Sequence, residues 1–209
     1  MQRGLLSLLA CALLAAGQEQ PPVSFGTTVV LPGGLEGVVY HISRFSKAIP
    51  NLQKEKPRGK VYATSLNVPN RDFKEGFPGV TKRLEWFAID YTGRFWIEKP
   101  GLYRFALTSD DGSRLFIDER TVVDNDGVHP AATKTASVEL AGGIHHIRVQ
   151  YFQGPGLQVA LVLEVAGPDI AGAEGALRVF STDEFKPPAN PEDWKFPSVT
   201  TISPRGVGR

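Results

Sequence analysis

Two adjacent acidic residues, Asp110 and Asp111, are the residues of this chain whose type and spacing best fit a chemical role. Gly112 follows them, and apolar residues alternate with polar ones before the pair, at 101–108, and again after it from Leu115. Alternation with a period of two is typical of β-strands, so we expect the pair in a connection at the edge of a sheet. Two interpretations stay open: Asp and Gly supply the turn itself, or the carboxylate oxygens bind a hard cation such as calcium.

A second acidic segment, 124–127 (Asp-Asn-Asp-Gly), follows the next apolar run. It does not have the spacing of an EF-hand, because Val122 and Thr133 stand where that loop needs its first ligand and its closing glutamate. Asn and Gly accept positive φ, so the segment is predicted to be a turn between strands. The alternative is that Asp126 also lines the rim that carries Asp110 and Asp111.

The rest of the chain predicts many short strands and no long helix. The composition includes 22 Gly and 16 Pro among 209 residues, with 42% hydrophobic residues. Turn residues recur after roughly every ten positions, which is the spacing of an all-β protein with antiparallel strands. Thr92-Gly93 and Asp118-Glu119 are predicted to be two of these turns. Trp86 and Trp96 lie within predicted strands and are expected in the core.

Four segments, in this order along the chain, resemble the protective-antigen-type (PA14) domain family: 34–40, 109–118, 122–129 and 137–152. The resemblance extends over about residues 33–167. It implies an antiparallel β-sandwich or barrel of the kind found in secreted adhesins, glycosidases and toxins, often with a bound glycan.

The resemblance also implies a calcium site. In sugar-binding members the equivalent Asp-Asp pair is joined by a cis peptide that brings both carboxylates onto one calcium ion, whereas neighbouring residues of an extended chain point to opposite sides. Those members add an asparagine from a later loop, and here Gln153 stands in that place. Glutamine carries the same carbonyl on a longer arm. Asp110, Asp111 and Gln153 are therefore the candidate calcium ligands.

The same rim is predicted to bind the sugar. Phe152 lies at a strand end beside Gln153 and is the aromatic residue expected to stack on a sugar ring. Asp126 is expected to help orient the ligand, and sugar hydroxyls would complete the coordination of the ion. The predicted function is a secreted carbohydrate-binding or adhesion module that recognises a glycan or polysaccharide.

No catalytic site is predicted. The sequence contains no Gly-x-Ser-x-Gly elbow, phosphate-binding loop or His-Glu-x-x-His motif. A formal net charge of +1, without a basic stripe, argues against nucleic acid as a partner. Two alternatives remain: a structural or protein-interaction module of the cell envelope, and a small glycan hydrolase.

The domain organisation predicted from the sequence has four parts. Residues 1–17 resemble a secretion signal, whose apolar stretch is too short to span a bilayer. Residues 18–28 are a linker, 29–182 the β-sandwich domain, and 183–209 a Pro-rich tail that is partly disordered. We expect a secreted, periplasmic or cell-surface protein. Cys11, the sole cysteine, also fits a lipobox, so lipid anchoring is the alternative to simple cleavage.

Overall fold

The computed structural model describes residues 33–80, 83–170 and 175–187. The predicted leader with Cys11, the linker and all but the first residues of the predicted tail lie outside these ranges. The strands of the described part are β1 (Leu35–His41), β2 (Pro57–Ala63), β3 (Asn67–Asp72), β4 (Phe87–Ile97), β5 (Gly101–Asp110), β6 (Ser113–Ile117), β7 (Arg120–Asn125), β8 (Ala132–Leu140), β9 (Gly143–Gln153), β10 (Gln158–Ala166) and β11 (Arg178–Val179). Two short 3-10 helices, η1 (Leu52–Lys54) and η2 (Phe73–Glu75), accompany them.

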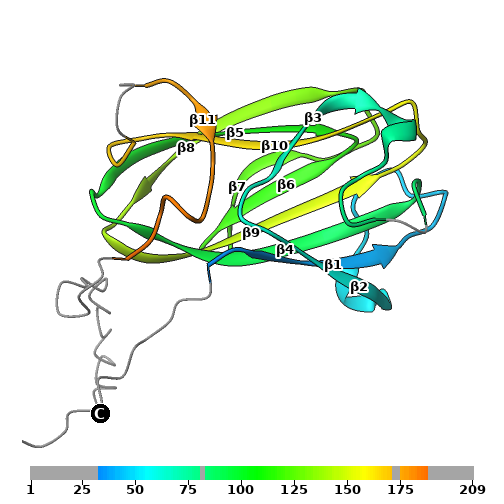
Figure 1. Cartoon of the computed structure of the whole chain (residues 1–209), viewed down its shortest axis with the longest axis horizontal. Helices are drawn as coiled ribbons and strands as arrows, with labels where there is room; N and C mark the ends of the chain where they lie inside the picture. The colour runs from blue at the N-terminus through cyan, green and yellow to red at the C-terminus, as the bar shows by residue number, and fades with distance from the viewer. Residues whose placement is uncertain (1–32, 81–82, 171–174, 188–209) are drawn as a thin grey trace, which may run out of the picture.

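The strands form two sheets that pack face to face (Figure 1). One sheet has six strands in the order β2-β1-β4-β9-β6-β7, and the other has the order β11-β10-β5-β8, with β3 also paired to β10. All of these pairs are antiparallel. The predicted antiparallel β-sandwich is confirmed. No helix in the described ranges has the length and hydrophobicity needed to cross a bilayer.

The core lies between the sheets and follows from the alternation in the sequence. On β5, Tyr103, Phe105 and Leu107 point inward and are fully buried. Inward residues of β9 and β10, such as Tyr151 and Leu161, pack in the same cluster. Burial of each such side chain contributes about 1.5–3 kcal/mol. This packing makes the sandwich a rigid support for the loops at its ends.

One predicted turn is wrong. Thr92-Gly93 does not reverse the chain, because β4 continues through both residues and pairs with β1 and β9 along its length. Gly93 is required there by packing: a Cβ atom would lie 2.7 Å from Leu35 Cδ2 and 2.8 Å from the Gly34 carbonyl oxygen. The predicted turn at Asp118-Glu119 is present, and both residues have positive φ.

The folded body extends beyond the predicted domain end at Thr182. Phe185 is buried, stacks on Phe180 with ring centroids 5.2 Å apart, and accepts a backbone hydrogen bond from Trp96. The first residues of the predicted tail are therefore part of the core.

One end of the sandwich collects the loops that carry the candidate site; it is the right-hand end in Figure 1. The connections β5–β6, β7–β8 and β9–β10 all cross from one sheet to the other at this end. The chain also leaves β1 and enters β4 here, because His41 pairs with Phe87 and Phe87 pairs with Gln153. We call this end the rim.

Candidate functional site

Asp110 and Asp111 lie in the β5–β6 connection, as predicted. Asp110 is the last residue of β5, and β6 begins at Ser113. The peptide bond between the two aspartates is cis. Both residues are buried, with 6% and 3% of their surface exposed, respectively. The rim therefore holds two adjacent carboxyl groups largely out of water.

Asp111 joins three rim connections through its carboxylate. Oδ1 accepts a hydrogen bond from the backbone N–H of His129 at 3.2 Å, in the β7–β8 connection. Oδ2 accepts one from the backbone N–H of Gly154 at 2.7 Å, in the β9–β10 connection. The geometry of all three loops thus depends on this one side chain.

The electrostatics of the pair favour a proton or a cation. Burial raises the pKa of Asp111 to about 6; the Gly154 N–H opposes this shift and the neighbouring Asp110 carboxylate adds to it. Burial also raises the pKa of Asp110. Among the described residues, neither aspartate forms an ion pair with a Lys, Arg or His side chain. Two buried carboxylates without such a partner are an environment that a bound cation stabilises.

Next to the pair lies an open cleft of about 520 Å³, which we call the rim cleft; it is lined by Arg44, Phe45, Ser46, Lys47, Trp86, Val128 and Pro155. Its residues come from the loop after β1, the residue before β4, and the β7–β8 and β9–β10 connections. Gly154 lies beside both the carboxylate and the cleft: a Cβ atom at this position would lie 3.0 Å from Asp111 Oδ2 and 3.5 Å from Trp86 Cζ3, and Trp86 lines the cleft. The Asp111 carboxylate and the indole ring of Trp86 therefore both lie next to Gly154, and we call this part of the cleft the shared wall.

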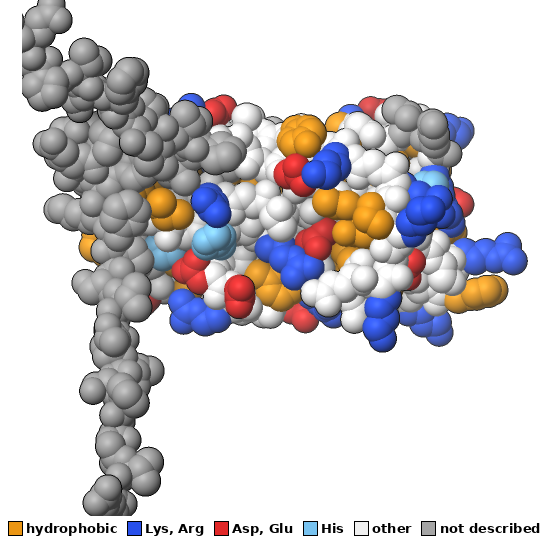
Figure 2. Space-filling model, turned by 90° about the horizontal axis from the view of Figure 1, so that it is seen from below, with side chains coloured by type: hydrophobic (Ala, Val, Ile, Leu, Met, Phe, Trp, Pro, Cys, Tyr) orange, Lys and Arg blue, Asp and Glu red, His pale blue; other side chains and the backbone are white. Residues whose placement is uncertain are grey.

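The rim cleft combines aromatic, apolar and basic groups. Phe45 is 79% exposed, and the Arg44 guanidinium lies over its ring, 5.4 Å from the centroid. The lining includes Lys47 but no acidic residue. In Figure 2, which views the outer face of the six-stranded sheet, Lys and Arg side chains gather at the same end of the molecule.

The family model described as PA14 domain matches residues 55–175, which is more than half of the chain. The chain belongs to the PA14 domain family. The matched region includes the Asp110–Asp111 pair and all three crossing connections of the rim. No curated protein matches the sequence.

Solved structures share the fold of this PA14 domain. The PA14 sugar-binding domain from an RTX adhesin is 19% identical with a TM-score of 0.56, over 72% of this chain and 96% of that one. The PA14 domain of the MpAFP antifreeze protein is 20% identical with a TM-score of 0.57, over 81% and 94%. An anti-sigma factor domain-containing protein is 19% identical with a TM-score of 0.57, and 79% of this chain matches only 50% of that one. This chain thus spans about half the length of that protein.

The donor set of this PA14 domain fits calcium through two residues. Asp110 and Asp111 offer carboxylate oxygens, which are the ligands that calcium prefers. No group of three or more His, Cys, Asp or Glu residues that could hold a metal occurs in the described ranges. Calcium takes six to eight oxygen ligands in all, so those beyond Asp110 and Asp111 must include backbone carbonyls, water or ligand hydroxyls.

Gln153 reaches the pair, but with its nitrogen. Its Oε1 accepts a hydrogen bond from the Tyr151 hydroxyl at 2.6 Å, while Nε2 lies 3.5 Å from Asp111 Oδ2 and donates to the Gln158 carbonyl at 3.2 Å. The side chain is fully buried. Its carbonyl oxygen is thus already engaged, and the expectation that Gln153 is a calcium ligand is not supported by its position. It supports the Asp111 carboxylate instead.

Phe152 does not offer a face to a sugar. Its ring is fully buried in a small cluster with Ile42, Ile49, Leu52 and Ala88. It also packs under Gly112, where a Cβ atom would lie only 2.5 Å from Phe152 Cε1. The predicted stacking role of Phe152 is therefore not supported. The ring forms the floor beneath the rim loops.

Asp126 holds the rim together rather than facing a ligand. Its Oδ2 pairs with the Arg114 guanidinium at 2.6 Å, and its Oδ1 accepts the Ile49 backbone N–H at 3.0 Å. The bond to Ile49 fixes the loop that carries Arg44 to Lys47 against the β7–β8 connection, and the pair with Arg114 fixes that connection against β6. The predicted place of Asp126 at the rim holds, and its contacts make it a positioning residue.

The predicted place of Trp86 is wrong. The residue was expected inside a strand and in the core, but β4 begins only at Phe87, and Trp86 has a φ of 58° and is half-buried. The alternation around it suggested a strand, and nothing in the pattern marks a residue with positive φ. Trp96 is buried, as predicted.

Proposed function

We propose that this PA14 domain is a non-catalytic carbohydrate-binding module whose ligand occupies the rim cleft beside Asp110 and Asp111. The observation that carries the proposal is the shared wall at Gly154, which places a buried, unneutralised carboxylate next to the indole of Trp86. A polar anchor beside an aromatic face is the combination that a sugar requires, because each pyranose ring has an apolar face and a polar edge.

Different residues of the cleft lining would contact the apolar face and the polar edge of the sugar. Trp86 and Phe45 offer aromatic surface to the C–H face of a sugar ring. Ser46 and Lys47 offer hydrogen-bonding groups at the edge of the same cleft. The sugar-binding RTX adhesin domain with the same fold supports this assignment as an analogy of fold.

We propose calcium as the cofactor, held by Asp110 and Asp111. A calcium ion bound there supplies positive charge and free coordination positions for sugar hydroxyls. The Tyr151 hydroxyl shares its single hydrogen between Gln153 Oε1 at 2.6 Å and the Asp110 carbonyl oxygen at 2.7 Å, and Gly154 and His129 hold the Asp111 carboxylate. The bonds from His129 and Gly154 orient the Asp111 carboxylate before a ligand arrives, which reduces the cost of ordering the site on binding.

The proposal includes a location outside the cytoplasm, at the cell surface or in the secreted fraction, because residues 1–17, which precede the domain, resemble a secretion signal. The rival is a structural or protein-interaction module of the cell envelope, in which the acidic connections only shape the rim. The two differ in whether a sugar binds at all.

A glycan array tests the proposal. The full chain is applied with calcium and again with EDTA, together with the double variant Asp110→Asn/Asp111→Asn and, as a matched control, Glu139→Gln, which neutralises an exposed carboxylate on β8 of the other sheet. We expect the wild type and Glu139→Gln to bind at least one glycan class in calcium, and the double variant and the EDTA sample to lose it. Absence of binding to every glycan would support the structural rival.

A further inference from the structure

The outer face of the six-stranded sheet carries a second concave surface, away from the rim. Two cavities of about 890 Å³ and 690 Å³ lie on this face, and Thr92 and Gly93 line both of them. They therefore form one groove that runs across the strands. We call it the sheet-face groove; its side chains include Tyr62, Glu36, Thr92, Arg94, Arg148 and Phe116.

The register of the sheet sets these side chains in a row. Tyr62 on β2 pairs with Glu36 on β1, and Glu36 pairs with Thr92 on β4. Thr92 pairs with Arg148 on β9, which pairs with Phe116 on β6. Neighbouring strands lie about 4.8 Å apart, so the row spans about 19 Å. That length suits an extended oligomer better than a single small molecule.

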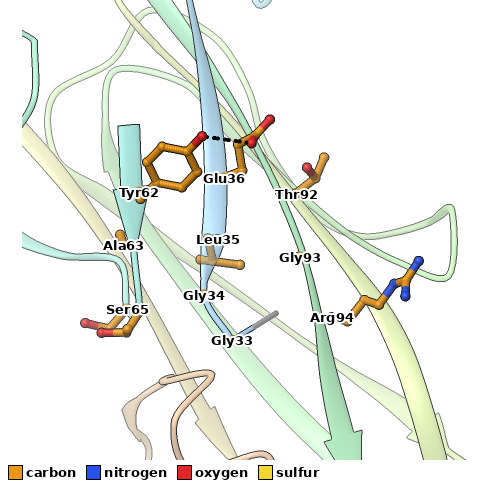
Figure 3. A pocket seen from close by; sticks show the side chains of 11 residues that line it. Gly33, Gly34, Leu35, Glu36, Tyr62, Ala63, Ser65, Thr92, Gly93 and Arg94 are labelled. Carbon is orange, nitrogen blue, oxygen red and sulfur yellow. Dashed lines mark hydrogen bonds between the residues drawn. The ribbon is translucent and has the colours of Figure 1, made fainter. Parts of the chain in front are cut away.

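Tyr62 is an exposed aromatic residue that is nevertheless held in place. It is 72% exposed on the edge strand β2. Its hydroxyl donates to Glu36 Oε2 at 3.1 Å (Figure 3), and Lys60 Nζ lies 2.8 Å from Glu36 Oε1. Because the hydroxyl is tethered, the ring is presented at the groove with little freedom left to lose on binding.

The polar groups of the groove match a neutral, hydroxyl-rich ligand. Figure 3 shows Glu36 on the strand next to the Tyr62 ring, and Thr92 and Arg94 on the strand beyond it. Acidic, basic and hydroxyl groups alternate here, so donors and acceptors are both available and neither sign of charge dominates. In Figure 2 this face likewise mixes acidic and basic side chains along its middle. A polyanion or a polycation would meet like charge on such a surface.

We propose that the sheet-face groove is a second carbohydrate site, which binds a linear, neutral oligosaccharide across the strands with one ring stacked on Tyr62. The site is separate from the rim and includes no candidate calcium ligand. Its ligand therefore binds equally well in calcium and in EDTA. Among the described residues, no tryptophan lines the groove, so this ligand leaves the indole N–H resonance of Trp86 unchanged, whereas a ligand in the rim cleft shifts it.

Calorimetric titration of the full chain in EDTA tests the proposal, with cellohexaose, xylohexaose and mannohexaose as probes. Tyr62→Ala removes the stacking surface, and Thr92→Trp fills the middle of the groove from an exposed position. Leu102→Ala is the matched control, because Leu102 is 57% exposed on β5 of the other sheet.

We expect one probe to bind the wild type and Leu102→Ala alike, and to bind Tyr62→Ala and Thr92→Trp about tenfold more weakly. Failure of all three probes in EDTA would overturn the proposal, and so would equal affinity for wild type and Tyr62→Ala. Either result leaves the proposal for the rim unaffected, because the rim is tested in calcium through Asp110, Asp111 and the indole N–H resonance of Trp86. Thermal unfolding of each variant checks that it is folded.

Discussion

Gly154 donates its backbone N–H to Asp111 Oδ2 at 2.7 Å, and a Cβ atom on Gly154 would lie 3.0 Å from that oxygen and 3.5 Å from Trp86 Cζ3. The bond ties the β9–β10 connection to the β5–β6 connection. The charge at Asp111 is therefore coupled to the shape of the rim cleft, since loss of the acceptor would release the loop that forms the shared wall. Calcium, pH and sugar binding are expected to be linked through this contact.

Calcium should stabilise the wild type and not the double variant Asp110→Asn/Asp111→Asn. A ligand at about 100 times its Kd stabilises the folded state by about 2.7 kcal/mol. For a chain of this size each kcal/mol raises Tm by about 2–4 °C. Thermal unfolding with calcium and with EDTA measures the difference, and Glu139→Gln serves as the control. An equal calcium-induced shift in the double variant would place the ion elsewhere.

The stability of the metal-free protein should decrease as pH rises from about 4 to about 6. In the folded protein burial raises the pKa of Asp111 from its usual 3.8 to about 6. The folded state therefore binds more protons than the unfolded state in this window, and stability falls with pH by about 1–3 kcal/mol. Asp110 contributes in the same direction.

Denaturant unfolding in EDTA at several pH values checks the sign. Asp111→Asn should flatten the decrease, because the variant has no proton to lose at this position. The comparison uses the slope with pH and not the absolute stability, since the amide also loses one of the two N–H bonds that the carboxylate accepts. A wild-type stability that rises through the same window would contradict the assignment.

Gly112→Ala should disrupt the rim from below. A Cβ atom at this position would lie 2.5 Å from Phe152 Cε1, 2.7 Å from Asp126 Oδ1 and 2.7 Å from the Gly127 nitrogen. Overpacking of this kind costs about 1–3 kcal/mol, and here it also moves the segment next to Asp111. We expect a lower Tm and weaker calcium binding.

Gly59→Ala is the control for this substitution. Nothing lies within 4 Å of a Cβ atom at Gly59, which is on the exposed edge strand β2. The same change of residue should leave the free energy of unfolding unchanged or raise it by up to about 1 kcal/mol, because alanine restricts the unfolded chain. Tm should accordingly stay the same or rise. Equal effects of the two substitutions would argue against the close packing at Gly112.

Removal of the aromatic groups of the rim cleft should weaken sugar binding without loss of calcium binding. Phe45→Ala removes a ring that is 79% exposed, so its cost in stability should be within about 0.5 kcal/mol. Trp86→Ala removes a half-buried ring and should cost more in both stability and affinity. Calorimetric titration with the glycan found on the array measures the affinity of both variants, with Leu102→Ala as the control. Unchanged affinity in both variants would exclude the rim cleft as the sugar site.

The fold could be predicted from the sequence because its alternation is strong where the core is. Tyr103, Phe105 and Leu107 alternate on β5 and are buried, as the pattern requires. Gly93 misled the prediction, because a glycine inside a strand has the same local signal as one in a turn. Only the approach of β1, with the Gly34 carbonyl 2.8 Å from the position of a Cβ atom, explains it.

The candidate site could be predicted only in part. Adjacent carboxylates between two alternating runs indicated the rim correctly, because the position of a connection follows from the strands around it. The roles of Gln153, Phe152 and Asp126 depend on which atoms face the rim, and a sequence does not contain that information. Trp86 was assigned to the core because its position near Gly154 brings together residues far apart in the chain.

Chemical-shift mapping of the full chain with its array-selected glycan, in calcium, tests the central claim most directly. The account predicts that the largest changes occur at the indole N–H of Trp86 and at the backbone amides of Gly112, His129 and Gly154. It predicts that EDTA reverses these changes. Saturable binding of that glycan with all four signals unmoved would contradict the assignment of the rim cleft as its site.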